Sequence, residues 1–349
     1  ENENLYFKPI TPKLSDLELI SLIILAVFKS IDSEHQLLEK LKALKLNPKY
    51  LTMIIPSRWM KGGKGLKSFR INMMNDKRIK CIYDYQNSEA LFPSVHIDGG
   101  ICYFLWDKNY NGKVEYYYTD HKGVQTFSKR NLKVDFYDKI IRDNRQISIV
   151  SKVRKKTKEN FSKIVGTSGG SFGFHTYLFN EPERYSEVKL SDVPKENYSL
   201  IHGVLGQAGG SKRVSKYINN DSIKRGLESV DKYKLFFSKA FSQDSTTPPE
   251  IIEGEPGHIS TATFLKIGDF ETKKEMLNCK KYMETKFFRA LFFINRSSFL
   301  TTVETFSLIP LQDFSKSWTD EELYKKYKLT QEEIDYIEET IDPMPSSDE

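Results

Sequence analysis

One stretch of the chain, residues 50–107, limits the fold more than any other because strand-like and helix-like segments alternate in it. Its first segment, 51–56, is a short and nearly continuous apolar run, which is typical of a strand covered on both faces. A helix over 66–74 and strands over 79–83 and 101–106 are predicted to follow. This order of elements predicts an α/β fold in which helices pack on an open sheet.

A glycine-rich loop follows the first of these strands. Residues 61–65 read Lys-Gly-Gly-Lys-Gly, and Arg58 comes just before them. Ligands of open α/β sheets usually bind at the carboxyl ends of the strands. The backbone of such a loop, with Lys61 and Lys64, would suit a phosphate group, whereas the alternative is a flexible loop with solvated lysines. We take Arg58, Lys61 and Lys64 as candidate DNA-contacting residues.

The second loop of the stretch carries an aromatic side chain, Phe92, followed by Pro93. A ring on a loop at a sheet edge can stack on a nucleobase, which contributes ~1–3 kcal/mol per base. Packing into the core from the loop is the commoner role of a phenylalanine. Composition does not decide between the two.

The residues before this stretch predict two helices. Ser15 and Glu18 form a capping-box pattern that opens a helix over 16–30. Leucines on one face predict a second helix over 34–45. The Asn-Pro pair at the start of segment 47–50 ends this helix.

The composition shifts toward Gly, Ser and Thr from residue 161 onward. We therefore predict a first domain over 1–158, a mixed α+β domain over 159–311 and a helical tail over 312–349. A helix over 136–158 would link the first two. Short strand-like runs in the second domain lie at 163–165, 199–205, 234–238, 263–267 and 305–309.

Lysine and arginine side chains cluster in one span of the second domain, which begins in the glycine-containing loop 209–213. Such side chains suit phosphate and guanine contacts, so we expect the cluster to face phosphates. The sequence does not indicate which side chain reads which base. The cluster consists of Lys212, Arg213, Lys216, Lys224 and Arg225.

Two other segments have charge patterns with a less specific meaning. The basic run 152–158 is as readily explained by a solvated helix end as by DNA contact. The other is the acidic tail.

The aromatic residues of a helix predicted over 273–293 are expected to form core. Thr319 and Thr330 each open an acidic helix with a capping box, and we expect this tail to pack on the protein.

The net charge of +6 suits a polyanionic partner without requiring one. Cys81, Cys102 and Cys279 are scattered and odd in number, which fits neither a disulfide framework nor a metal site. The longest apolar run, 19–28, is too short for a bilayer, whose crossing needs ~20 residues. We therefore expect a soluble, cytoplasmic protein without a bound metal.

Several long strings of the chain carry a family resemblance. They include MIIPSRWMKGGKGLKSFR, NDKRIKCIYDYQNSEALFPSVHIDGGICYFLW and IPLQDFSKSWTDEELYKKYKLTQEEIDYIE. In this order they resemble the second half of the adenine-specific DNA methyltransferases of type II restriction–modification systems, of the TaqI-like class. The resemblance covers residues 37–344, and several strings in order are more specific than one short motif.

The resemblance implies a partial Rossmann-like methyltransferase sheet, S-adenosylmethionine as methyl donor and double-stranded DNA as substrate. It also implies that the target adenine is flipped out of the duplex, because its exocyclic amine is otherwise inside the stack. The flipped base would lie between a tyrosine of the family's Asn-Pro-Pro-Tyr tetrad and Phe92. The domain over 159–311 would be the target recognition domain.

The chain departs from the family's pattern where the catalytic groups are expected. Residues 15–33, where the tetrad should fall, contain no Asn, Gly or Pro, and the family's glycine-rich cofactor motif is not found. Segment 47–50, Asn-Pro-Lys-Tyr, is one residue away from the tetrad, and we interpret it as a turn that leads into the next strand.

We therefore expect no catalytic and no cofactor-binding residue in this chain. Methyl transfer would require an upstream or separate catalytic half. The alternatives are a non-catalytic DNA-specificity module that acts with a separate catalytic chain, or a remnant without function.

Overall fold

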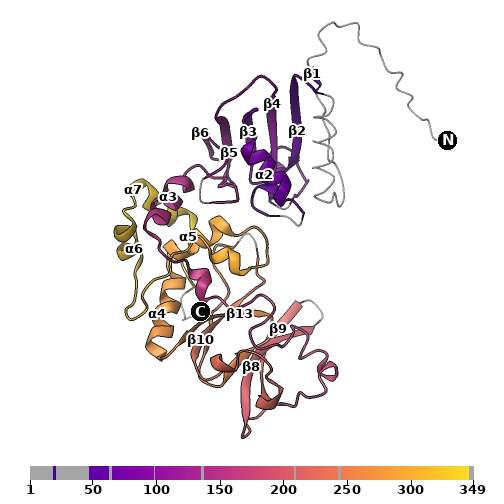
Figure 1. Cartoon of the computed structure of the whole chain (residues 1–349), viewed down its shortest axis with the longest axis vertical. Coiled ribbons are helices and arrows are strands. Elements are labelled where there is room, and N and C mark those ends of the chain that lie inside the picture. The colour runs from indigo at the N-terminus through magenta and orange to yellow at the C-terminus, as the bar shows by residue number, and fades with distance from the viewer. Residues whose placement is uncertain are drawn as a thin grey trace, which may run out of the picture. The chain divides into compact units, whose positions relative to one another are not determined.

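The chain folds into two compact units, Glu1–Asn144 and Arg145–Glu349 (Figure 1). The predicted division into 1–158, 159–311 and 312–349 stays a prediction. The structure, a computed structural model, describes residues 19–20, 47–62, 65–97, 99–134, 137–207, 210–242 and 245–345.

The first unit is built on a six-stranded mixed sheet with the order β1-β2-β4-β3-β5-β6. β4 is antiparallel to both β2 and β3, whereas β1 with β2 and β3 with β5 form parallel pairs. Consequently β1, β2, β3 and β5 run in one direction, and their carboxyl ends lie at the same edge. The strands are β1 Leu19–Ile20, β2 Tyr50–Pro56, β3 Ile79–Tyr85, β4 Ile101–Asp107, β5 Val114–Thr119 and β6 Gln125–Arg130.

Most elements predicted for this unit are confirmed. β2, β3 and β4 lie where strands were predicted, and α2, Lys67–Asn75, is the predicted helix. β1 lies inside 16–30, so the helix prediction was wrong for these two residues, because a continuous apolar run suits a buried strand as well as a helix. The rest of 16–30 and the helix over 34–45 lie outside the described residues. The Rossmann-like assignment stays a prediction.

One face of this sheet forms the core of the unit with α2 and the 3-10 turn η1, Ser57–Met60 (Figure 1). Leu51, Met53 and Ile55 of β2 are buried there, and the residues between them are half-buried. The two faces of β2 therefore differ in burial, although its apolar run predicted full cover on both.

The other face carries a row of apolar residues that stand directly opposite one another on five strands. In this row Tyr83 stacks on Tyr103 and Tyr117, with ring centroids 4.8 and 4.4 Å apart. Ile54 of β2 and Phe127 of β6 complete it, and Phe127 is 56% exposed. Aromatic cross-strand pairs of this kind stabilise a sheet and fix its register.

The second unit has two small sheets with the orders β11-β10-β13 and β12-β8-β9-β7. Its strands are β7 Leu190–Ser191, β8 Tyr198–Gln207, β9 Gly210–Asn219, β10 Tyr233–Ser238, β11 Ile252–Gly254, β12 His258–Ser260 and β13 Phe264–Phe270. Its α-helices are α3 Gln146–Lys156, α4 Lys273–Glu284, α5 Lys286–Asn295, α6 Asp320–Tyr327 and α7 Gln331–Thr340.

Predictions for this unit were less accurate. β8, β10 and β13 are confirmed, but the runs 163–165 and 305–309 fall on 3-10 turns and adjoining irregular chain, so those strand predictions were wrong. The predicted loop 209–213 is, from Gly210, the start of β9.

The long helix predicted over 273–293 is two helices, because Thr285 leaves the helical backbone and caps α5. The linking helix starts at Gln146 rather than 136. The capping boxes at Thr319 and Thr330 are confirmed as the starts of α6 and α7.

The tail helices pack on α3, as predicted for an acidic tail. Lys152 Nζ of α3 forms an ion pair with Glu333 of α7 at 2.7 Å, and Gln146 Nε2 donates to Tyr336 Oη at 2.8 Å. Part of the basic run 152–158 is thus paired within the protein. No helix among the described residues is long and apolar enough to cross a membrane.

Candidate functional site

The loops that follow β2 and β3 meet at one edge of the first sheet. Ser57 N–H donates to Gly100 O at 2.9 Å, which joins the end of β2 to the end of the loop 86–100. A Cβ on Gly99 would stand 3.3 Å from Cβ of Arg58, so these two residues are in contact. The structure therefore brings Arg58 to the loop that carries Phe92.

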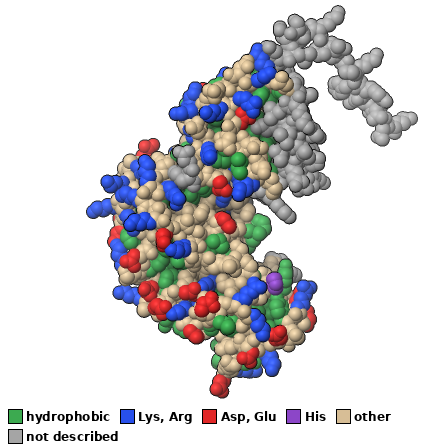
Figure 2. All heavy atoms as spheres, in the orientation of Figure 1, with side chains coloured by type: hydrophobic (Ala, Val, Ile, Leu, Met, Phe, Trp, Pro, Cys, Tyr) green, Lys and Arg blue, Asp and Glu red, His purple; other side chains and the backbone are tan. Residues whose placement is uncertain are grey.

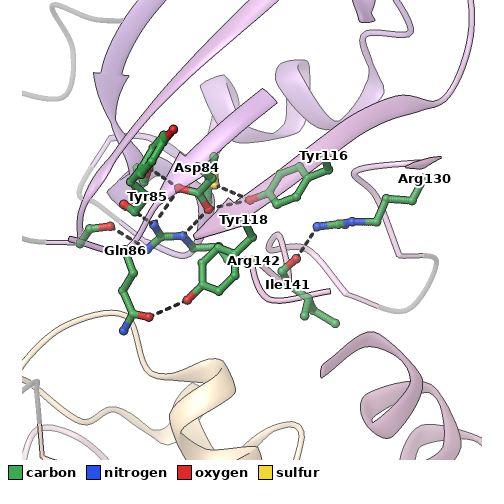
Figure 3. A network of polar contacts seen from close by, with 11 residues as sticks. Asp84, Tyr85, Gln86, Tyr116, Tyr118, Arg130, Ile141 and Arg142 are labelled. Atoms are coloured by element: carbon green, nitrogen blue, oxygen red, sulfur yellow. Dashed lines mark hydrogen bonds and ion pairs between the residues drawn. The ribbon is translucent and has the colours of Figure 1, made fainter. Parts of the chain in front are cut away.

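A fully buried carboxylate, Asp84, lies at this edge and accepts four hydrogen bonds (Figure 3). Ser57 Oγ and Tyr116 Oη each donate at 2.7 Å. Arg142 donates twice, from Nε and Nη2, both at 2.7 Å. A carboxylate offers about four acceptor positions, so Asp84 is saturated.

Arg142 is 7% exposed and also binds two backbone carbonyls, those of Tyr85 at 3.3 Å and Gly99 at 2.6 Å. Burial acts to lower the pKa of its guanidinium, but the charge and hydrogen bonds of Asp84 outweigh burial and raise it. In the same environment, burial and then the negative charge of Asp84 raise the pKa of Tyr116. The guanidinium of Arg142 is therefore kept charged and the phenol of Tyr116 neutral.

Lys61 is half-buried at the same edge. Burial, and after it the positive charges of Arg142 and Lys139, lower its pKa to about 7. An anion bound nearby would favour the charged form and raise this pKa again. The backbone beside Lys61 is held by Arg70, whose Nη1 donates to the carbonyls of Trp59 at 3.1 Å and Gly62 at 3.3 Å. Lys64 lies outside the described residues.

Phe92 is half-buried in a loop with its own hydrogen bonds. Its N–H donates to Ser88 O at 3.0 Å, and its carbonyl accepts from Val95 N–H at 3.1 Å. The buried Ser88 hydroxyl donates to Val95 O at 2.6 Å and accepts from Ile97 N–H at 2.9 Å. These bonds give the loop a defined path around Phe92.

The basic cluster of the second unit is only partly available for phosphates. Arg213 lies 3.6 Å from Glu250, Lys216 3.2 Å from Asp192 and Lys224 2.7 Å from Glu187. Lys212 on β9 and Arg225 are exposed. On the face shown in Figure 2, Lys and Arg side chains of this unit are interspersed with Asp and Glu side chains.

Two features of the site were missed in the sequence. Asp84 stands on the inward face of β3 with Ile82, and a charged residue at such an alternating position is the signal that could have marked it. Arg142 follows two apolar residues, but nothing local indicates its partner, which is 58 residues earlier in the sequence.

A shallow groove along α4 was also missed. Its lining includes the four lysines of that helix, Lys273, Lys274, Lys280 and Lys281. Lys273 and Lys280 are paired with Glu255 and Glu253.

Asp84, the buried carboxylate at the ligand edge of the sheet, has no acceptor position left for ribose hydroxyls. Among the described ranges there is likewise no group of three or more His, Cys, Asp or Glu side chains that could hold a metal ion.

Comparison with known proteins finds a family match inside the first unit. Residues 38–92 match the model of the Eco57I restriction-modification methylase family. This matched segment contains β2, α2 and β3 and ends at Phe92. A 74-residue segment is 46% identical to a Mycoplasma pneumoniae protein described as an uncharacterized adenine-specific methylase. The aligned part spans 21% of this chain and 18% of that relative.

Two solved structures have a distant likeness to the chain. The type IIG restriction endonuclease BpuSI is 11% identical, with a TM-score of 0.30 over 84% of this chain and 47% of its own. The type IIL restriction-modification enzyme MmeI, solved in complex with DNA, is 10% identical, with a TM-score of 0.30 over 66% of this chain and 34% of its own. Part of the chain is thus similar to adenine-specific methylases of restriction–modification systems.

Proposed function

We propose that this chain supplies the base-stacking and DNA-contacting parts of a site-specific adenine DNA methyltransferase of a restriction–modification system. In the complete enzyme a methyl group would pass from S-adenosylmethionine to the exocyclic amine of a flipped adenine. One observation carries the proposal: the family match over 38–92 ends at Phe92, in the loop whose Gly99 contacts Arg58 at the ligand edge of the sheet.

The environment of Phe92 supports a stacking role. Its ring is half-buried on a loop rather than enclosed in the core, and the Ser88 hydrogen bonds fix the backbone around it. A flipped base needs an apolar face to lie against, and a ring held in place loses little entropy when the base arrives.

DNA contacts are proposed from both units. Arg58 contacts Gly99 of the Phe92 loop, and a phosphate that approaches Lys61 at the same edge would favour the charged form of this lysine. In the second unit, Lys212 and Arg225 are the first candidates of the basic cluster. The cations with acidic partners would have to exchange these partners for phosphates: Arg213, Lys216 and Lys224.

The cofactor and the groups that hold the target amine would come from sequence other than the described residues. The saturated Asp84 and the missing tetrad both support this division of roles. Catalysis would therefore need a further segment or chain that brings the cofactor motif.

Transfer of a labelled methyl group from S-adenosylmethionine to duplex DNA tests the proposal. We expect DNA binding but no transfer by this chain, and transfer once a polypeptide with the cofactor motif and the tetrad is added. Phe92→Ala should then lower kcat by at least about tenfold, because stacking contributes ~1–3 kcal/mol. Phe92→Tyr, which keeps the ring, is the matched control.

Robust transfer by the chain alone would contradict the proposed incompleteness. Equal rates for the alanine and tyrosine variants would remove Phe92 from the base pocket.

A second candidate is a non-catalytic specificity module that binds DNA for a separate catalytic chain. The second unit favours it, because it has its own core around Ile201, Phe236 and Ile259. Co-purification with a chain that carries the tetrad would support this role, and methylation by one continuous polypeptide would exclude it.

A further inference from the structure

We propose that Arg142 is a positioning residue: its guanidinium holds both ends of the Phe92 loop and thereby fixes the ring that would face the flipped base. The consequence for the base rests on the proposed function, whereas the fixing of the loop does not. No part of Arg142 is required to touch DNA.

The hydrogen bonds of Arg142 reach the chain at both ends of the loop. Tyr85 O, at the end of β3, accepts from Nη2, and Gly99 O, just before β4, accepts from Nη1 (Figure 3). One rigid, planar group thus connects the position where the loop leaves the sheet to the position where it returns to the sheet. A fixed fork of donors suits this task, since it needs no reorganisation for each bond.

The guanidinium is itself held from two sides. Asp84 on β3 binds it through two parallel hydrogen bonds of 2.7 Å. The backbone that carries it is fixed next to it: Arg130 Nη2 donates to Ile141 O at 2.6 Å, and Ile140 N–H donates to Met60 O at 2.8 Å. Neither the side chain nor its backbone is therefore free to follow a moving loop.

A glycine allows the two ends of the loop to lie close together. Gly100 has φ +78°, and a Cβ there would lie 2.1 Å from Tyr85 O. Only glycine allows the two ends of the loop to approach this closely. Tyr118 also holds the start of the loop, because its hydroxyl donates to the Gln86 side chain at 2.7 Å. The Arg142 guanidinium lies over the Tyr118 ring.

The ends of the loop connect to Phe92 through a short chain of bonds. Ile97 N–H donates to Ser88 Oγ, and Ser88 O accepts from Phe92 N–H. If Gly99 loses its hydrogen bond to Arg142, the added backbone motion would therefore extend to Phe92, since only a few residues and these two bonds lie between them. By this geometry Arg142 acts on Phe92 through the loop backbone and not by contact.

Hydrogen exchange of the 349-residue chain, resolved to peptides, tests the proposal. Arg142→Lys keeps a positive charge for Asp84 but loses the fork, so we expect amides of 86–97 to exchange at least about tenfold faster. Amides of β2 and β4 should keep their wild-type rates. Arg78→Lys is the matched control, since it makes the same exchange at an exposed arginine that pairs with Asp76.

A second variant guards against global unfolding. In Asp84→Asn/Arg142→Met both charges of the buried pair are removed together, which avoids leaving one of them unpaired. It should retain a cooperative unfolding transition and show the same faster exchange over 86–97. Ser88→Ala should loosen the same peptide without any change in the buried pair.

Wild-type exchange over 86–97 in both Arg142 variants, with the fold intact, would overturn the proposal. Equal acceleration in 86–97, β2 and β4 would overturn it as well, because the role would then be general stability. If the loop loosens as expected but Phe92→Ala leaves methyl transfer unchanged, the positioning role stands and the proposed function fails.

Discussion

At the scale of single residues, the edge of the first sheet depends on one buried ion pair. Asp84 and Arg142 are almost fully buried, and each has several hydrogen-bond partners. A buried pair of this kind adds little net stability by itself, but removing one member is costly because the other charge is left in a low-dielectric environment. Its value here is in fixing the position of the chain.

Asp84→Asn should therefore lower the free energy of unfolding by about 3–5 kcal/mol, because Arg142 would keep its charge without a counter-ion. Urea denaturation followed by tryptophan fluorescence measures this, since Trp59 and Trp106 lie in the same core. Glu115→Gln is the control, because its ion pair with Lys129 is on the surface and should contribute far less to stability. Similar costs for both variants would contradict the prediction.

A second residue-scale effect concerns pH. Burial, followed by the positive charge of His258 and Lys234, lowers the pKa of His202 to about 4. Its ring also contacts Ser215 Oγ at 2.8 Å and packs on Phe236. The neutral imidazole is therefore the form that the folded protein accommodates.

Since the unfolded chain protonates this histidine near pH 6.5, folding stability should fall as the pH drops from about 6.5 to about 4 and level off below. The expected loss is about 3 kcal/mol, from ~1.4 kcal/mol per pKa unit. In His202→Gln this part of the pH dependence should disappear. Thermal unfolding measured across that range checks it, with His175→Gln, an exposed histidine, as control; an unchanged slope in His202→Gln would refute it.

At the scale of elements, the break between α4 and α5 determines where the aromatic core of the second unit is placed. Thr285 ends α4, and its buried hydroxyl accepts from Phe288 N–H at 3.2 Å to cap α5. The direction that α5 takes after this break sets where its rings lie: Phe287 packs on Tyr327, and Phe288 packs on Phe161.

Thr285→Ala should lower the free energy of unfolding by about 1–2 kcal/mol, through loss of the cap and of the bond to Tyr282 O. Thr285→Ser, which keeps the hydroxyl, should recover most of this loss. The midpoint of urea unfolding distinguishes the two. Equal stability of the alanine and serine variants would show that the hydroxyl does not cap α5.

The sequence predicted elements well where a local pattern decides them and poorly where tertiary contacts do. β2, α2, β3 and β4 follow from apolar runs and a glycine-rich loop. β9 was missed because Gly210–Lys216 is polar and becomes a strand only by pairing with β8. At the site, Phe92 could be singled out, whereas Arg142 could not, since its role depends on contacts far apart in the sequence.

At the scale of the whole molecule, many basic side chains are paired with carboxylates. The net charge of +6 is therefore not concentrated in one cluster of free cations. DNA affinity should therefore depend on a limited number of phosphate contacts. Each such contact contributes about 0.9 to the slope of log K against log salt concentration. The slope thus counts the cations that reach phosphates.

Lys212→Ala should reduce this slope by about 1 and weaken binding to all duplexes alike, which titrations at several salt concentrations measure. Lys232→Ala is the control, since Lys232 is already paired with Glu271 at 2.6 Å. A slope unchanged by Lys212→Ala would show that β9 does not contact the DNA backbone.

The position of β4 in the sheet also has a consequence for how the chain folds as it is synthesised. β2 and β3 are consecutive strands, yet they pair with β4 and not with each other. The middle of the sheet therefore cannot close before Ile101–Asp107 has left the ribosome, and both edges of β3 are open until then. Pairing strands that are so many residues apart is slow compared with forming a hairpin. Correct formation of this part of the sheet therefore requires that the open strand edges of the nascent chain do not pair with other strands first.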